Sequence, residues 1–124
     1  MSIGLLLADD FLFISRIQGH ARALGLEVQS VRTQEKLLHR ATDKKPTCVI
    51  LDVHVAGLDV ATLVPALKKL DPVPNIVAYG SHVEAATLAA ARAAGCDLVL
   101  PKSRFVEELP IALMAWMKPP IKND

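Results

Sequence analysis

Three carboxylates and one amine follow short apolar runs of the sequence, at the places where strands of a parallel sheet would end. Asp9 and Asp10 follow the first run, Asp52 follows the third, and Lys102 comes shortly after the fifth. Because ligands of open α/β folds bind at the carboxyl ends of the strands, we expect these side chains to share one edge. Carboxylates in one place repel one another unless a cation lies between them. Mg²⁺ suits such a set, because it takes few carboxylates and keeps waters that a phosphoryl group can replace.

The same side chains could also take part in covalent chemistry. A carboxylate such as Asp52 can act as a nucleophile and become an aspartyl phosphate, while the Lys102 ammonium would neutralise phosphoryl oxygens. Each acid alone also has a structural explanation, since Asp caps helices and favours turns, and Asp10 stands where a helix would begin. An acid pair, a further Asp and a Lys, each after a different strand, favour a shared functional origin over separate caps.

Strands and helices alternate along the sequence. The apolar runs are 3–8, 26–31, 47–51, 75–79 and 97–100, and the helical patterns are 11–24, 33–42, 59–70, 81–94 and 104–117. Most runs are continuous, which is typical of strands covered on both faces, whereas the run 26–31 carries polar residues and is expected at an edge. Five repeats of strand and helix, joined by right-handed crossovers, predict a doubly wound α/β fold of three layers.

Individual residues predict helix ends and core positions. Asp59 is a candidate N-cap, and Ser81 with Glu84 forms the capping-box pattern, which predicts that a helix opens at this point. Gly95 is a candidate C-terminal stop. Tyr79 and Trp116 are expected to pack in the core or at an interface.

Composition bounds the class of protein. The chain has 124 residues, with 14 basic against 13 acidic ones, which suits one domain and argues against a dedicated nucleic-acid binder. No apolar run approaches the roughly 18 residues that cross a bilayer, and the N-terminus lacks the basic segment of a signal peptide. Cys48 and Cys96 are expected to be buried free thiols of a cytoplasmic protein. We expect a domain over residues 1–118 and a loose tail or linker start over 119–124.

Three segments together resemble the receiver domain of two-component response regulators: Leu-Leu-Leu-Ala-Asp-Asp at 5–10, Val-Ile-Leu-Asp at 49–52 and Leu-Pro-Lys-Ser at 100–103. The resemblance covers nearly the whole chain. It implies a flavodoxin-like (βα)₅ fold, a three-layer sandwich around a parallel five-stranded sheet in the order 2-1-3-4-5. In that family a histidine kinase or phosphotransfer protein donates a phosphoryl group, and a downstream effector protein or domain receives the signal. We therefore expect no enzymatic activity beyond self-phosphorylation and self-dephosphorylation.

The resemblance also implies a role for each candidate site residue. Asp52 is similar in position to the phospho-acceptor, and Lys102 to the lysine that contacts the phosphate. Asp9 and Asp10 are similar to the acid pair that binds Mg²⁺ together with the acceptor. The backbone carbonyl of His54 falls where the family supplies a further metal ligand.

The sequence departs from the family at the positions that normally respond to phosphorylation. Gly80 stands where the family has Thr or Ser, although Ser81 could supply a hydroxyl by a shift of one residue, and Val99 stands where the family has an aromatic residue. Two interpretations follow. Either the chain accepts phosphate and signals by binding partners, or it is a degenerate pseudo-receiver that acts as a phosphate-independent interaction or dimerisation module. The retained acids and Lys102 favour the first interpretation.

One motif points elsewhere. Asp52, His54 and Gly57 fit the pattern D-x-H-x-x-G, which resembles a cobalamin-binding signature. Here the pattern follows the third predicted strand rather than the first, and the later small-residue motifs of that family are missing. A short pattern of this kind arises easily by chance. We therefore predict that the His54 side chain belongs to a loop and faces solvent.

The output surface is a separate question. In the receiver family it is usually formed by the fourth helix, the fifth strand and the fifth helix, which correspond here to residues 84–94, 97–100 and 104–116. Small residues fill the first of these segments and would allow close helix approach. We therefore expect a homodimer through this face.

Overall fold

The computed structural model describes residues 2–118, and the tail expected over 119–124 lies outside the described residues. The strands are β1 (Ile3–Leu7), β2 (Glu27–Val31), β3 (Cys48–Asp52), β4 (Asn75–Gly80) and β5 (Leu98–Pro101). The helices are α1 (Phe11–Ala23), α2 (Gln34–Lys44), α3 (Val60–Lys68), α4 (Ala85–Ala94) and α5 (Lys102–Met117). The strands form one parallel sheet in the order β2-β1-β3-β4-β5, which confirms the predicted topology.

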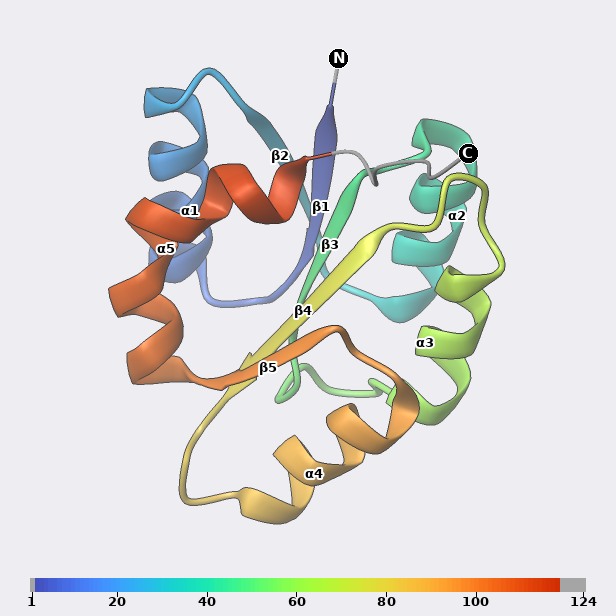
Figure 1. Cartoon of the computed structure of the whole chain (residues 1–124). Helices are drawn as coiled ribbons and strands as arrows, with labels where there is room; N and C mark the ends of the chain where they lie inside the picture. The colour runs from blue at the N-terminus through green and yellow to red at the C-terminus, as the bar shows by residue number, and fades with distance from the viewer. Residues whose placement is uncertain (1, 119–124) are drawn as a thin grey trace.

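Helices cover both faces of the sheet (Figure 1). Helices α1 and α5 pack on one face, and α2, α3 and α4 on the other. Successive side chains of a strand point to opposite faces, so Leu6 and Ile50 enter the α1–α5 core while Leu5 and Leu51 enter the α2–α4 core. The continuous apolar runs therefore belong to strands buried on both faces. None of the described helices is long and apolar enough to cross a membrane.

The burial of strand β2 and of Cys48 agrees with the sequence prediction, whereas that of Cys96 does not. Along β2 only Val28 and Val31 are buried, which confirms an edge strand. Cys48 is a buried free thiol, whereas Cys96 is only partly buried. Burial raises the pKa of Cys48 to about 12 and that of Cys96 to about 11, so both thiols stay protonated and unreactive near neutral pH.

The helix ends differ from the sequence prediction at one important place. The capping box at Ser81 and Glu84 does not form, because α4 begins only at Ala85 and the Glu84 side chain makes no capping hydrogen bond. The Ser81 hydroxyl instead accepts a bond from Val83 N–H at 3.4 Å within the preceding loop. The prediction was wrong because the Glu84 carboxylate has a partner on another loop, described below. The caps at Asp59 and Gly95 are confirmed.

An aromatic cluster fills the core between the sheet, α1 and α5. The ring of Phe105 stacks on Tyr79 at 4.4 Å and on Trp116 at 5.5 Å, and Phe13 lies against both Tyr79 and Phe105. This confirms the predicted packing of Tyr79 and Trp116. The Tyr79 hydroxyl has no hydrogen-bond partner among residues 2–118. Burial raises its pKa and the nearby charges of Asp52, Asp10 and Asp9 raise it further, so it stays protonated.

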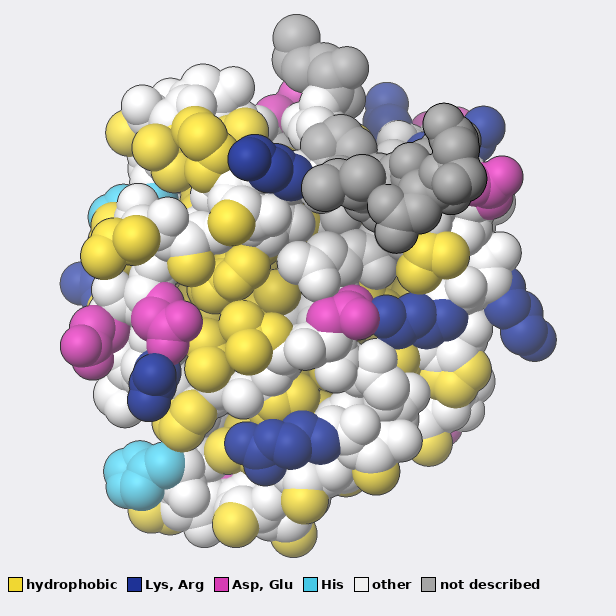
Figure 2. All heavy atoms as spheres, viewed as in Figure 1, with side chains coloured by type: hydrophobic (Ala, Val, Ile, Leu, Met, Phe, Trp, Pro, Cys, Tyr) yellow, Lys and Arg dark blue, Asp and Glu magenta, His cyan; other side chains and the backbone are white. Residues whose placement is uncertain are grey.

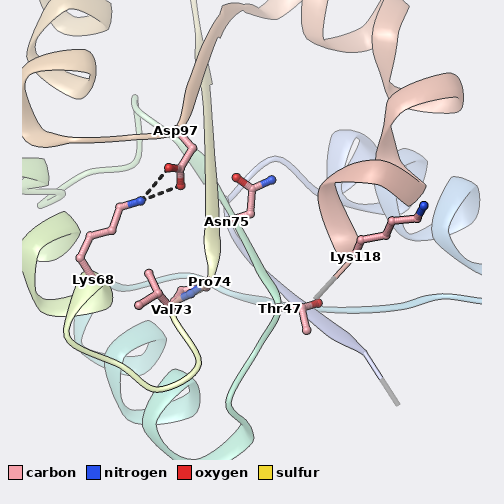
Figure 3. A pocket seen from close by; sticks show the side chains of 7 residues that line it. All are labelled: Thr47, Lys68, Val73, Pro74, Asn75, Asp97 and Lys118. Carbon is pink, nitrogen blue, oxygen red and sulfur yellow. Dashed lines mark hydrogen bonds and ion pairs between the residues drawn. The ribbon is translucent and has the colours of Figure 1, made fainter. Parts of the chain in front are cut away.

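The amino-terminal edge of the sheet is fastened to the end of α5. Thr47 Oγ1 donates to the Met117 carbonyl at 2.8 Å, and Asn75 Nδ2 donates to the Trp116 carbonyl at 3.3 Å. Beside them lies a hollow of about 330 Å³, where Lys68 pairs with Asp97 at 2.7 Å (Figure 3). This hollow lies at the opposite edge of the sheet from Asp52.

Candidate functional site

The strand register brings the predicted site residues to the carboxyl edge of the sheet. Asp52 is the last residue of β3 and pairs with Tyr79 on β4, while Asp9 comes two residues after the end of β1. Lys102 is the first residue of α5, directly after β5. Asp52 is the buried member of the set, with 9% of its surface exposed, whereas Asp9 is exposed. The site therefore consists of one buried acid at the base of an open acidic edge.

The electrostatics of Asp52 reflect this burial. Its Oδ1 accepts a hydrogen bond from His54 N–H at 2.9 Å. Burial raises the pKa of the Asp52 carboxyl, the His54 hydrogen bond and the positive charge of Lys102 act against this increase, and the negative charge of Asp9 adds to it. Asp9 and Lys102 therefore lie close enough to influence Asp52. A cation bound at this edge would favour the ionised, nucleophilic form.

Asp10 caps a helix, and its second oxygen lies near Lys102. Its Oδ1 accepts from Leu12 N–H at 3.0 Å and from Phe13 N–H at 3.2 Å, so it is the N-cap of α1. Its Oδ2 lies 3.9 Å from Lys102 Nζ, which also sits 4.5 Å above the Phe13 ring. Because the cap uses one oxygen, the other is directed toward the site.

The acids fit a small, hard cation better than a metal that needs a complete protein cage. Among residues 2–118, no three His, Cys, Asp or Glu side chains are grouped closely enough to hold a metal by themselves. Mg²⁺ does not need such a cage, because it binds through one or two carboxylates and keeps several waters. The effect of the Asp9 charge on Asp52 and the position of Asp10 Oδ2 outside the helix cap are consistent with that mode. The individual ligands stay a prediction.

Gly80 ends β4 directly beside the acceptor loop, and no side chain fits there. A Cβ atom at this position would overlap Val53 Cγ2 and would lie 3.0 Å from His54 Nε2 and 3.2 Å from Leu88 Cδ2. All three neighbours belong to side chains, and Val53 and Leu88 are buried. The space that a larger residue would fill at position 80 is therefore occupied by side chains of the loop after β3 and of α4.

His54 makes two contacts that the sequence did not predict. Its Nε2 accepts a hydrogen bond from Ser81 N–H at 2.8 Å, and its Nδ1 lies 3.1 Å from Glu84 Oε2. His54 lies in the turn after β3 and is exposed, which confirms the prediction of a solvent-facing loop histidine, although the ring also makes these two contacts. The ring reaches the loop before α4 beside Gly80, which has no side chain. That glycine was the one sequence signal that could have indicated the contact.

Comparison with known proteins decides the family. The sequence model described as the response regulator receiver domain matches residues 5–113. The chain belongs to the response regulator receiver domain family. It is 25% identical over 114 residues to the transcriptional regulatory protein PrrA of Mycobacterium tuberculosis and to that of Mycobacterium leprae. The match covers 92% of this chain and 49% of each relative, so the chain spans about half the length of these curated relatives.

Solved receiver structures share the fold. A putative response regulator from Chloroflexus aurantiacus superimposes with a TM-score of 0.78 at 22% identity, covering 94% of this chain and 97% of that one. The receiver domain of the sensor histidine kinase PA1611 from Pseudomonas aeruginosa, which has a magnesium ion coordinated in its active-site cleft, gives 0.77 at 21% with the same coverage. A Burkholderia pseudomallei response regulator with a phosphorylated aspartic acid and a calcium ion gives 0.76 at 21%, covering 95% and 67%.

This receiver differs from the expected family pattern at the two positions noted in the sequence. The Ser81 hydroxyl accepts a bond within its own loop from Val83 N–H. The idea that this hydroxyl takes the place of the one that the family has at position 80 stays a prediction. Val99 is buried in the core between the sheet and α2–α4. Because valine has no aromatic ring, this position cannot make a ring movement between the surface and the interior.

Proposed function

We propose that this receiver accepts a phosphoryl group on Asp52 from a histidine kinase or phosphotransfer protein and signals by binding a downstream effector. The observation that supports this best is the burial of Asp52 at the base of the acidic edge, with Asp9 and Lys102 near enough to act on its charge. Oδ1 is held by His54 N–H, so Oδ2 is the oxygen proposed to attack phosphorus. The new O–P bond forms as the bond between phosphorus and the donor nitrogen breaks, and the donor imidazole leaves with that electron pair.

The other site residues would stabilise this transfer. Bound Mg²⁺ would neutralise negative charge on the phosphoryl oxygens, held by Asp9, Asp10, Asp52 and the backbone carbonyl of His54. Lys102 would pair with a phosphoryl oxygen after leaving its present position above Phe13. We propose no catalysis beyond phosphorylation and dephosphorylation of the chain itself. The cytoplasmic location stays a prediction.

A second candidate function rests on Gly80. Val53, His54 and Leu88 fill the space beside it, so a hydroxyl side chain cannot enter without displacing them. Val99 likewise replaces the aromatic residue of the family. These departures favour a degenerate pseudo-receiver that keeps the fold as a phosphate-independent interaction or dimerisation module.

Intact mass after incubation with Mg²⁺ and a small phosphodonor tests the two proposals. We expect a gain of one phosphoryl group that is lost in Asp52→Asn and reduced in Lys102→Ala. Asp43→Asn is the matched control, because Asp43 is an exposed acid of α2 at a distance from the site. No adduct on the wild-type chain would reject the phosphorylated receiver and favour the pseudo-receiver. An adduct that persists in Asp52→Asn would show that another residue is the acceptor.

A homodimer through α4, β5 and α5 is proposed as the output state. Figure 2 shows apolar side chains gathered beside α5 and over β5. Leu98 and Val106 are only partly buried there, and α5 also exposes Ile111 and Met114. Light scattering over a range of concentrations, with and without beryllofluoride as a phosphoryl mimic, would measure the association. A mass that stays monomeric under all these conditions would reject the dimer.

A further inference from the structure

We propose that His54 is a positioning residue that transmits a change at Asp52 directly to the start of helix α4. The inference rests on the proposed phosphorylation of Asp52. It adds a specific path, in which the backbone of His54 contacts the acceptor carboxylate and the imidazole of the same residue contacts the β4–α4 loop. One residue therefore touches both the site of modification and the element that would respond.

The first contact of this path changes its strength when Asp52 is modified. In the unmodified chain, His54 N–H donates to a carboxylate oxygen of Asp52 at 2.9 Å, which is a charge-assisted hydrogen bond. After phosphorylation on Oδ2, Oδ1 becomes the carbonyl oxygen of an acyl phosphate and loses most of its negative charge. Because a neutral acceptor binds an N–H more weakly, the backbone of His54 is held less firmly. The modification thus acts on His54 before any side chain moves.

The second contact joins the imidazole to the loop that leads into α4. Nε2 accepts from Ser81 N–H at 2.8 Å, so the neutral ring carries its proton on Nδ1 and donates it to Glu84 Oε2 at 3.1 Å. Glu84 is the N-cap residue of α4, yet its side chain does not cap the helix. The imidazole therefore binds the loop at both of its ends, Ser81 and Glu84. A displacement of the ring must break one of these bonds or move the start of the helix with it.

The ring is exposed on one side and lies beside Gly80 on the other. A Cβ atom at Gly80 would come within 3.0 Å of Nε2, and the same Cβ atom would lie 3.2 Å from Cδ2 of Leu88, which is buried in α4. Val53, the residue before His54, is also buried. A shift of the His54 backbone is therefore transmitted to α4 through the contacts of the imidazole with Ser81 and Glu84.

A purely structural role would also explain these contacts, and the two roles predict different results. If His54 only fastens the loop, its removal loosens Ser81 and Glu84 but leaves the response of α4 to modification of Asp52 unchanged. If His54 transmits the change, its removal disconnects α4 from Asp52. A shift in population requires a contact that differs between the two states, and only the second role supplies that contact through His54.

Amide NMR spectra of the full chain with Mg²⁺, with and without beryllofluoride, distinguish these roles. In the wild type we expect chemical-shift changes both next to Asp52 and in residues 85–88. In His54→Ala the changes next to Asp52 remain, and those in residues 85–88 fall roughly two-fold or more. His54→Gln restores much of the response, because its amide can accept from Ser81 N–H and donate to Glu84. His82→Ala is the matched control, since this exposed histidine lies between Ser81 and Glu84 in the loop before α4. The response of residues 85–88 in this variant stays at the wild-type level.

The outcomes separate the failure of the inference from the failure of the proposed function. If changes next to Asp52 occur but the response of residues 85–88 persists in His54→Ala, the transmission through His54 is refuted while phosphorylation stands. If beryllofluoride changes nothing in the wild type, the proposed function fails and the inference fails with it. Glu84→Ala provides a second variant that removes the far end of the path from an exposed position. It should weaken the α4 response, and an unchanged response would contradict the inference.

Discussion

Replacing Gly80 by Ala is expected to destabilise this receiver, although Ala normally suits a strand better than Gly. The backbone of Gly80 does not require a positive φ, since the positive-φ glycines are 25, 57 and 95. Without the steric neighbours, Gly80→Ala would therefore stabilise the strand by about 0.5–1 kcal/mol. The neighbours reverse the sign, because the added Cβ would overlap Val53 Cγ2 and press on His54 Nε2 and Leu88 Cδ2.

The magnitude follows from how these neighbours can move. Val53 is β-branched and buried, so its methyl group can leave only by an unfavourable rotamer or a backbone shift. Overpacking of this kind costs about 1–3 kcal/mol. Subtracting the intrinsic gain of Ala leaves a range of about 0–2.5 kcal/mol, and because Val53 can move only at a cost we expect a net loss of about 1–2 kcal/mol in the free energy of unfolding. In a domain of this size that lowers the melting temperature by roughly 3–10 °C.

Urea unfolding followed by far-UV circular dichroism measures this loss, and Gly19→Ala is its control. Gly19 lies inside α1, and a Cβ there would meet nothing within 4 Å, so Gly19→Ala should stabilise by about 0.5–1 kcal/mol. Val53→Ala removes the overlapping methyl group, so the double variant with Gly80→Ala should be more stable than the sum of the single effects by about 1 kcal/mol. The reasoning is refuted if Gly80→Ala is as stable as the wild type, or if the two effects simply add.

Three further predictions concern stability. Tyr79→Phe should leave the free energy of unfolding unchanged or raise it by up to about 1 kcal/mol, because the hydroxyl has no partner among residues 2–118; a loss above that size would mean that the hydroxyl is bonded. Asp52→Asn should be more stable than the wild type at pH 7 in EDTA, because burial raises the pKa of Asp52 and the ionised form destabilises the fold. That advantage should shrink as the pH falls and vanish below about 4, where the carboxyl is protonated in both states; an advantage that grows toward low pH would contradict it. Asp97→Asn weakens the bonds to Lys68 Nζ and Ile76 N–H and should cost about 1–2 kcal/mol in urea unfolding, partly screened by salt; a cost near zero would show that Asp97 fastens nothing.

The sequence predicts the sheet well because a strand that is buried on both faces appears in the sequence as a continuous run of apolar residues. β3 is buried along its whole length, and its run of apolar residues needs no partner to be recognised. The strand order itself came from the family resemblance, since a continuous run does not say which strand lies beside it. Asp52 and Lys102 could be located because each stands next to a strand end.

The histidine contact could not be predicted because it depends on residues far apart in the sequence. The pattern of Ser81 and Glu84 is a local signal for a capping box, but the Glu84 carboxylate binds His54 on the loop after β3 instead. The ring of His54 in turn lies so close to Gly80 that a Cβ atom there would come within 3.0 Å of Nε2. Local patterns fail here because a stronger long-range partner competes for the same carboxylate, and only the folded structure shows that partner.

The end of α5 is bonded to the amino-terminal edge of the sheet, and this determines what the tryptophan fluorescence of the chain can report. Trp116, the only tryptophan of the chain, lies at the far end of α5 from Lys102, roughly 20 Å along the helix. Its backbone carbonyl is held by Asn75 at the amino-terminal edge of the sheet, away from the acids. A phosphoryl group on Asp52 is too distant to quench this indole by contact. A change in its emission on modification of Asp52 would therefore record motion of the aromatic core or of α5 itself, and a silent indole beside a modified Asp52 would mean that this half of the molecule stays still.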